Sequence, residues 1–206
     1  MKDNGYVAVL VREAFRRGGI DVEFQFHQWT RAVGLAKMGQ VDGYFPEYFD
    51  KKILSSAYFS EPFPGGPLGF FKLKSSKIDF DSLENSRGFI IGTVRGYINS
   101  KEFDDATFLI KDEVKDDLTN FKKLATGRID LLVADKYVGM WIVSHYLPEM
   151  KDKIEFMDNV LATKQLYVCI SRKSRKGDKF LKAFNTGLRL MKEEGMIGQI
   201  LGENGF

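Results

Sequence analysis

The sequence contains little of the chemistry that metal sites and disulfides require. Among its 206 residues there are one cysteine and two histidines. A single cysteine excludes an internal disulfide, and Cys169, His27 and His145 do not stand at the spacings of zinc ligands. We therefore expect no metal and no cofactor. Cys169 stands in an apolar run and is predicted to be a buried strand residue, whereas His27 alternates with apolar neighbours and is predicted at the surface.

Long apolar runs and a strong excess of one charge are also missing. No stretch approaches the roughly 18 apolar residues that span a bilayer, and the start at Met1 to Gly5 has no apolar region of a signal peptide behind it. The net charge is +3, with both signs mixed along the chain. The densest basic stretch, residues 171–176, is predicted to be a solvated turn. We therefore expect neither membrane insertion nor nucleic acid as a partner.

Short catalytic signatures are missing as well. There is no Gly-x-Gly-x-x-Gly, no Walker lysine and no Gly-x-Ser-x-Gly. What the chain has is 44% hydrophobic residues, including 18 Phe and 8 Tyr, and 29% charged residues. That composition predicts an ordinary globular protein with a sizeable core, in which no residue stands out as catalytic.

Helical and strand patterns alternate along the chain. A helical pattern over residues 7–15 ends at Gly18-Gly19, an alternating strand pattern covers 22–26, and a helix capped by Thr30 ends at Gly39 before a strand at 41–45. Further strands are predicted at 89–94, 107–110, 129–134 and 166–170, with helices after Asn99, around 118–124, from Asp135 and from Asp178. This order favours an α/β fold with a mostly parallel sheet covered by helices.

One short pattern occurs twice. Met-Gly-Gln-Val-Asp at residues 38–42 returns as Thr-Gly-Arg-Ile-Asp at residues 126–130. In each copy the glycine is predicted to take the left-handed conformation that ends a helix and allows an immediate turn into a strand. The repeat suggests two similar α/β lobes. The alternative, that such helix-Gly-strand joins occur in any α/β protein, stays open.

Several motifs follow one another in the order and at the spacing of a known family. They are VEF at 22–24, WTRA at 29–32, GQVDG at 39–43, FSEPF at 59–63, IGTVRGY at 91–97, LATGRID at 124–130, VAD at 133–135 and the helical tail 180–195. Together they resemble the polar-amino-acid-type solute-binding proteins of ABC importers (family 3, with the type II periplasmic-binding-protein fold). The resemblance covers nearly the whole chain.

The resemblance implies two Rossmann-like lobes joined by two crossing strands. Lobe one would comprise residues 1–68 plus 167–206, and lobe two residues 69–166. A small polar solute, such as an amino acid or a related amine or carboxylate, would be held in the cleft at the carboxyl ends of the strands. The partner would be the membrane permease of an ABC importer, and the location periplasmic or cell-surface.

The resemblance also implies ligand-binding residues in lobe two. Asp135 matches the family's acidic residue that accepts hydrogen bonds from the ligand's amino group. The alternative is that Asp135 only caps its helix. Gly96 and Tyr97 match the loop whose backbone amides bind a ligand carboxylate, although the small hydroxyl residues of the family are missing after the glycine. Arg95 is a further candidate beside this loop.

In lobe one the family's ligand loop corresponds to the residues after position 45. Here Glu47 and Tyr48 occupy it, and Trp29 is a further candidate wall residue. Amino-acid binders carry an arginine nearby that clamps the ligand carboxylate, whereas this chain has Lys51 and Lys52. An ordinary α-amino acid is therefore in doubt, and Glu47 is interpreted as facing a cationic or hydroxyl-rich solute.

A second departure concerns the first strand of the family, and two further classes of function stay open. The family's first strand, which precedes the helix expected near Tyr6, has no counterpart here, so we expect poor binding by this form and strand exchange with a second copy. A few relatives of the fold are cyclohexadienyl-type dehydratases, in which Glu47 or Asp135 would serve as acid or base. A ligand-sensing domain of a membrane receptor is the third class.

Overall fold

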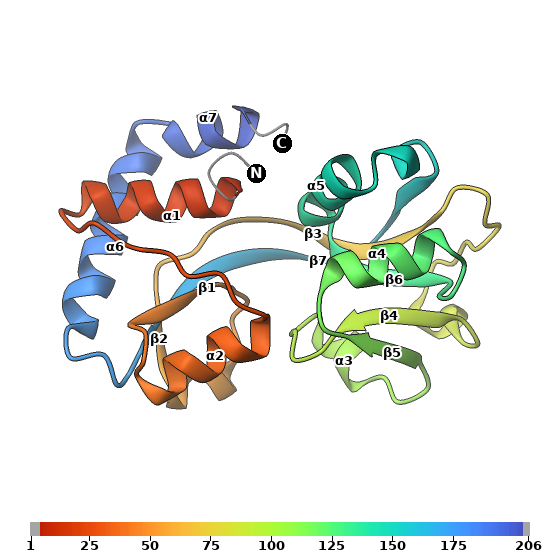
Figure 1. Ribbon diagram of the computed structural model, residues 1–206, viewed down its shortest axis with the longest axis horizontal. Helices are drawn as coiled ribbons and strands as arrows, with labels where there is room; N and C mark the ends of the chain where they lie inside the picture. Colours follow the sequence, from red (N-terminus) through yellow and green to blue (C-terminus); the bar gives the residue numbers. More distant parts are fainter. Residues whose placement is uncertain (1–4, 204–206) are drawn as a thin grey trace. The chain divides into compact units, whose positions relative to one another are not determined.

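The computed structural model describes residues 5–203, and these residues form a mixed α/β fold (Figure 1). The helices are α1 (Tyr6–Arg17), α2 (Trp29–Met38), α3 (Lys101–Asp105), α4 (Asp117–Ala125), α5 (Lys136–Tyr146), α6 (Gly177–Glu193) and α7 (Met196–Glu203). The strands are β1 (Gly43–Glu47), β2 (Ala57–Phe59), β3 (Phe63–Leu73), β4 (Ile90–Val94), β5 (Ile110–Val114), β6 (Leu131–Asp135) and β7 (Ile154–Ser171). The expectations about Met1–Asn4 and about residues 204–206 lie outside the described residues.

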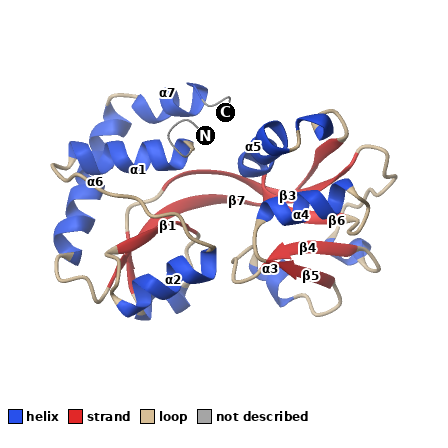
Figure 2. Ribbon diagram, in the orientation of Figure 1, coloured by secondary structure: helices blue, strands red, loops and turns tan. Residues whose placement is uncertain are grey.

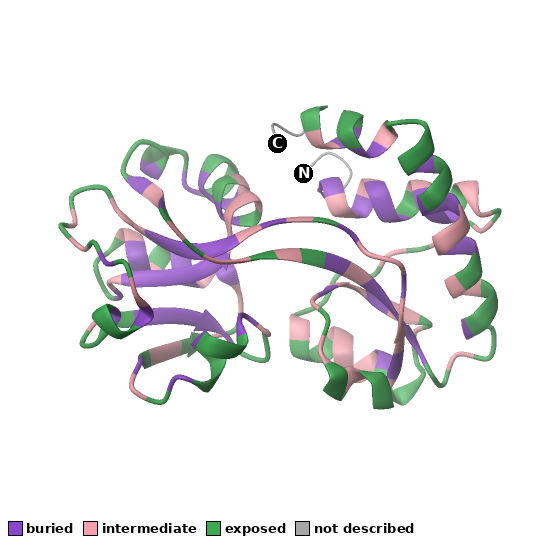
Figure 3. Ribbon diagram, turned by 180° about the vertical axis from the view of Figure 1, so that it is seen from behind, coloured by how far each residue is buried: buried purple, intermediate pink, exposed green. Residues whose placement is uncertain are grey.

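The chain divides into two compact units. Unit 1 comprises the residues up to His27, Arg31–Pro64 and the residues from Gln165 onward, and unit 2 comprises Gln28–Thr30 and Gly65–Lys164. Strands β3 and β7 each begin in one unit and end in the other. The middle of β7 alternates between intermediate and exposed residues, unlike its buried end in unit 1 (Figure 3).

Unit 2 is a sheet with an apolar layer on each face. Strand β4 runs parallel to β5 and β6, while β3 runs antiparallel to β6. Successive residues of β6 face opposite layers: Leu131 packs in the same cluster as Phe103 of α3, and Leu132 in the same cluster as Phe121 of α4. This alternation follows from the two-residue period of a strand. The sheet of unit 2 is thus covered by apolar side chains on both faces.

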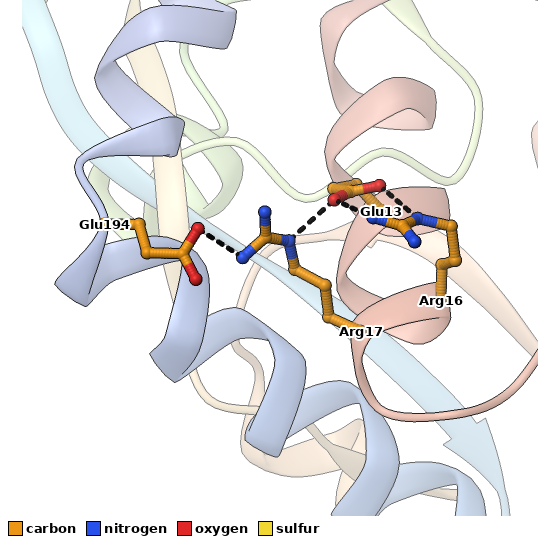
Figure 4. A network of polar contacts seen from close by, with 4 residues as sticks. All are labelled: Glu13, Arg16, Arg17 and Glu194. Atoms are coloured by element: carbon orange, nitrogen blue, oxygen red, sulfur yellow. Dashed lines mark hydrogen bonds and ion pairs between the residues drawn. The ribbon is translucent and has the colours of Figure 1, made fainter.

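Unit 1 is held together by the packing of α1 against α6. The ring of Phe15 lies 5.2 Å from that of Phe184, and the backbones approach closely at Gly187. At the end of α1, Arg17 donates hydrogen bonds to Glu13 and to Glu194 at 2.6 and 2.5 Å (Figure 4). Arginine hydrogen bonds lower the pKa of Glu13 to about 2. Strands β1 and β2 both pair antiparallel with the last residues of β7.

Gly187→Ala is expected to destabilise unit 1 by about 2 kcal/mol. A Cβ at this position would lie 1.8 Å from the carbonyl oxygen of Ala14, so the two helices would have to separate. Gly198→Ala on α7 is the matched control, since nothing lies within 4 Å of a Cβ there. Urea unfolding followed by circular dichroism measures the difference, and equal midpoints for both variants would contradict the close approach.

The repeated pattern has the predicted backbone geometry in both units. Gly39 and Gly127 follow the ends of α2 and α4 with φ angles of 76° and 67°, which confirms the left-handed conformation at both positions. The aspartates of the two copies also have similar roles. Asp42 accepts a hydrogen bond from Ser174, and Asp130 accepts one from the Ile90 amide. Each therefore ties the strand entrance to a neighbouring segment.

Four local predictions were wrong. Residues 22–26 form no strand, because no strand within residues 5–203 pairs with them, and the connection from α1 to α2 is a loop (Figure 2). Thr30 lies inside α2 and caps nothing, since the helix begins at Trp29. Helix α6 begins at Gly177, so Asp178 is in its first turn and makes no side-chain cap. Strand β5 lies three residues later than predicted, where it pairs with β4.

Other local predictions are confirmed. Cys169 is fully buried in β7, and His27 is exposed. Burial raises the pKa of the Cys169 thiol to about 12. Within residues 5–203, no helix has both the length and the apolar character needed to cross a bilayer.

Candidate functional site

Three polar side chains of unit 2 follow the carboxyl ends of its parallel strands. Tyr97 comes three residues after β4, Asp117 three residues after β5, and Asp135 is the last residue of β6. Parallel strands end at the same edge of a sheet, and that edge is where open α/β sheets bind ligands. The geometry of unit 2 therefore places these side chains on one edge.

Asp135 is the N-cap of α5 and also ties the helix to β3. Its Oδ1 accepts hydrogen bonds from the amides of Tyr137 and Val138 at 2.9 and 3.2 Å, and its Oδ2 accepts one from the Gly66 amide at 2.9 Å. Burial raises the pKa of Asp135, while the three amides act in the opposite direction. The capping role is thus confirmed. A carboxylate offers roughly four acceptor positions, so one remains for a ligand.

Asp117 lies beside Tyr97 and was missed by the sequence analysis. The Tyr97 hydroxyl donates to its Oδ2 at 3.1 Å, and the residue is only 8% exposed. Burial raises the pKa of Asp117 to about 6; the Tyr97 hydrogen bond lowers it, and the charges of Asp116 and Asp135 raise it further. The Asp116-Asp117 pair after β5 could have identified this residue. The strand was predicted at 107–110, however, which is too early for the pair to stand at its end.

The glycine loop after β4 forms a tight turn whose amides are engaged within the chain. Gly96 has a φ of 80°, the Tyr97 amide donates to the Val94 carbonyl at 3.1 Å, and the Asn99 amide donates to Asp104 at 2.9 Å. Two of the amides expected to bind a carboxylate therefore already have acceptors.

Arg95 and Trp29 flank this loop differently. The Arg95 side chain is 71% exposed and lies 3.7 Å from the carboxylate of Glu113, so it is directed to solvent. Trp29 groups with unit 2: its indole Nε1 donates to the Gly96 carbonyl at 3.1 Å, and its ring meets Tyr97 edge to face at 5.6 Å. Trp29 thus packs beside Tyr97.

In unit 1 the candidate residue Glu47 ends β1. It is 5% exposed and accepts hydrogen bonds from the Tyr48 amide at 2.9 Å and from the Tyr44 hydroxyl at 3.3 Å. Burial raises the pKa of Glu47 to about 7, although both hydrogen bonds lower it. Tyr48 itself is half-buried, and Phe45 packs against Phe24 at 4.8 Å.

Three carboxyl groups of the candidate residues form no ion pair within the part of the chain that the structure describes. Among the ion pairs of residues 5–203, none includes Glu47, Asp117 or Asp135 within 4.0 Å. Lys51 and Lys52, which stand near the expected arginine position, are exposed. A buried ionised carboxylate is costly unless it is paired. The charge of Lys37 lowers the pKa of Glu47, whereas no cation does so for Asp117 or Asp135, so these two are the better suited to accept a cation from outside the chain.

Comparisons with known proteins place the fold. No protein-family model and no curated protein matches the sequence. Many solved structures match, among them a histidine kinase sensor domain with similarity to periplasmic binding proteins (20% identity, 97% of this chain and 85% of that one, TM-score 0.84).

Two further neighbours were solved with amino acids. The GluR0 ligand-binding core from Nostoc punctiforme, in complex with L-glutamate, is 18% identical over 98% of this chain and 91% of its own, with a TM-score of 0.80. An amino acid ABC transporter substrate-binding protein from Streptococcus pneumoniae, bound to L-arginine, is 14% identical over 97% and 83%, with a TM-score of 0.82.

The chain is an α/β protein of two units joined by β3 and β7, the class that these neighbours define. More specifically, it has the type II periplasmic-binding-protein fold, as the motif resemblance implied. These neighbours are binding or sensor domains, and at such low identity they establish the fold alone.

Proposed function

We propose that the chain is the extracytoplasmic solute-binding component of an ABC importer, which binds a small polar, amine-bearing solute. The observation that carries the proposal is the half-buried carboxylate of Asp135 at the carboxyl edge of unit 2, which forms no ion pair with another side chain of residues 5–203. The fold supports it, because neighbours of the same fold were solved with amino acids. A periplasmic or cell-surface location and a permease partner belong to the same proposal.

The two units would act as the two lobes. The solute's ammonium group would donate to Asp135. The rings of Trp29, Tyr48 and Tyr97 and the carboxyl group of Glu47 would complete the site. The proposed ligand-binding residues are Asp135, Tyr97, Gly96, Arg95, Glu47, Tyr48 and Trp29. Closure would be driven by contacts that form only when both lobes touch the solute. In this proposal the chain binds without catalysing a reaction.

A ligand-sensing domain is the second candidate, and the similarity to a histidine kinase sensor domain favours it. Both roles use the same binding step. They differ in the partner that responds to the bound form, a permease in transport and a kinase domain in sensing. A permease gene beside the gene for this chain would support transport. A membrane helix and a kinase domain in the same reading frame would support sensing.

A thermal-shift screen tests the binding function common to both candidates. Amino acids, polyamines and small carboxylates are each added to the protein at millimolar concentration. A ligand present at about 100 times its Kd should stabilise the native state by about 2.7 kcal/mol and raise the melting temperature. We expect amine-bearing compounds to give the shift. Shifts with carboxylates that lack an amine, and with no amine, would overturn the proposal.

A further inference from the structure

The turn between β7 and α6 carries a concentration of positive charge. Of the 11 residues at 172–182, 6 are lysine or arginine and Asp178 is the single acidic one. All of these basic side chains are exposed. Two further exposed lysines belong to the short helix Lys51–Ser55, whose Leu54 carbonyl accepts a hydrogen bond from Arg172 at 2.7 Å. The cations of residues 172–182, together with Lys51 and Lys52, form the basic end of unit 1 (Figure 1).

The carboxylates of the protein leave this charge uncompensated. Ion pairs occur along the rest of residues 5–203, but none of them includes a cation of the basic end. Two carboxylates that contact these segments are engaged with uncharged groups: Asp42 accepts a hydrogen bond from the Ser174 hydroxyl at 2.6 Å, and Asp50 accepts one from the Lys52 amide at 2.8 Å. The positive charge of the basic end is therefore open to a partner.

The position of these cations on α6 is unfavourable within the protein itself. Lys179 and Lys182 stand three residues apart on the face opposite the buried Phe184 and Leu188, and like charges at that spacing repel each other. Lys176 and Lys179 also stand at the beginning of the helix, where the helix dipole favours negative charge. An anionic partner would relieve this repulsion.

The backbone that carries the charge is fixed by contacts within unit 1. The buried hydroxyl of Ser171 donates to the Ala36 carbonyl at 2.6 Å, at the end of α2. The Arg172 guanidinium lies 4.1 Å from the centre of the Tyr58 ring. The basic end is therefore already arranged before a partner arrives, so binding does not have to order the turn.

The composition of the basic end favours a lipid surface over nucleic acid. Six of its cations are lysines, whose ammonium groups on long stems suit a layer of phosphate headgroups. Surfaces that bind single-stranded nucleic acid add open aromatic rings for the bases, whereas the ring of Tyr58 is covered by Arg172. The exposed apolar side chain beside the cations is the aliphatic Leu54, which suits the boundary between headgroups and acyl chains.

We infer that the basic end of unit 1 is an interaction surface for an anionic phospholipid membrane. The chain binds there peripherally, through charge, with no segment crossing the bilayer. The inference goes beyond the proposed function and does not depend on it, because the residues that carry it are separate from the proposed ligand-binding residues.

Co-sedimentation of the whole chain with lipid vesicles tests the inference. Vesicles of equal parts phosphatidylglycerol and phosphatidylcholine are compared with vesicles of phosphatidylcholine alone. We expect binding to the anionic vesicles at about 0.1 M NaCl and its loss at about 1 M, where charges are screened beyond about 3 Å. Equal sedimentation with both kinds of vesicle, or sedimentation with neither, would overturn the inference.

The combined variant Arg175→Gln, Lys176→Gln and Lys179→Gln should bind the anionic vesicles about 100-fold more weakly. Each cation near an anionic surface contributes about 1 kcal/mol, which is about fivefold in the binding constant. The three side chains are exposed and form no ion pair within residues 5–203, so the fold should be retained. Melting curves by circular dichroism verify this.

A second combined variant, Lys77→Gln, Lys122→Gln and Lys151→Gln, is the matched control. It removes the same charge from exposed lysines of unit 2 and should bind as the wild type does. Undiminished binding by the folded unit 1 variant, or an equal loss in the control, would contradict the assignment of the surface.

A double-stranded DNA oligonucleotide at about 0.1 M NaCl separates lipid from other polyanions. We expect binding to it to be weaker than binding to the anionic vesicles, and equal or tighter binding to DNA would overturn the lipid assignment. The thermal-shift screen measures solute binding separately, so the failure of either proposal leaves the other standing.

Discussion

Asp135→Asn is expected to weaken the binding of an amine-bearing solute by about 10- to 100-fold, because a hydrogen bond to a charged group contributes about 1.5–3 kcal/mol. Asparagine keeps one oxygen, which can still accept from Tyr137 and Val138 at the start of α5. It replaces the oxygen that accepts from Gly66 by an amide nitrogen, so a drop in stability of about 1 kcal/mol should accompany the loss of binding.

The choice of asparagine separates binding from folding. Asp135→Ala would remove all three hydrogen bonds and with them the helix cap, which costs about 1–2 kcal/mol by itself. Titration calorimetry measures affinity, and the melting temperature measures the fold. Asp152→Asn serves as the exposed control. An unchanged affinity in folded Asp135→Asn would remove Asp135 from the site.

Glu47→Gln is expected to stabilise the protein above neutral pH by up to about 3 kcal/mol. The folded-state pKa of Glu47 is about 7, against 4.5 for an ordinary glutamate, chiefly because the carboxyl is buried at the end of β1. Between these two values the folded chain holds a proton that the unfolded chain has released. The stability of the wild type therefore falls as pH rises from about 4.5 to 7 and stays low above it.

Glutamine cannot ionise, so this decline should disappear in the variant. Urea unfolding at half-unit intervals from pH 4.5 to 8 gives the two stability curves, which should meet at the acidic end and diverge toward pH 8. Glu149→Gln, at an exposed glutamate, is the matched control and should follow the wild type. Parallel curves for Glu47→Gln and wild type would show that the carboxyl is not desolvated in solution.

Local sequence signals predicted much of the fold because they act over a few residues. The turn glycines Gly39 and Gly127 reflect a conformation that other residues rarely adopt, and their geometry is as predicted. The alternating segment 22–26 failed because a strand requires a hydrogen-bonding partner. Instead Phe24 contacts the Arg12 guanidinium and the ring of Phe45, and Phe26 is 62% exposed.

The site was harder to predict than the fold, because its contacts join distant residues. Asp135 was placed correctly at a strand end, but its bond to Gly66 arises from the pairing of β3 with β6, which no local pattern encodes. Asp117 was missed through an error of three residues in β5. Whether Asp135, Asp117 and Glu47 bind a solute stays a prediction.

The interleaving of the two units has a consequence for synthesis on the ribosome. Unit 2 is nearly one continuous stretch of chain, Gly65–Lys164, and can fold as soon as it emerges. The apolar face of α1 must wait for α6, which begins roughly 160 residues later, or about 8–30 s at 5–20 residues per second. During that interval Leu10, Val11 and Phe15 are without their final cover, so this apolar face is open to contacts with other chains until α6 has been made.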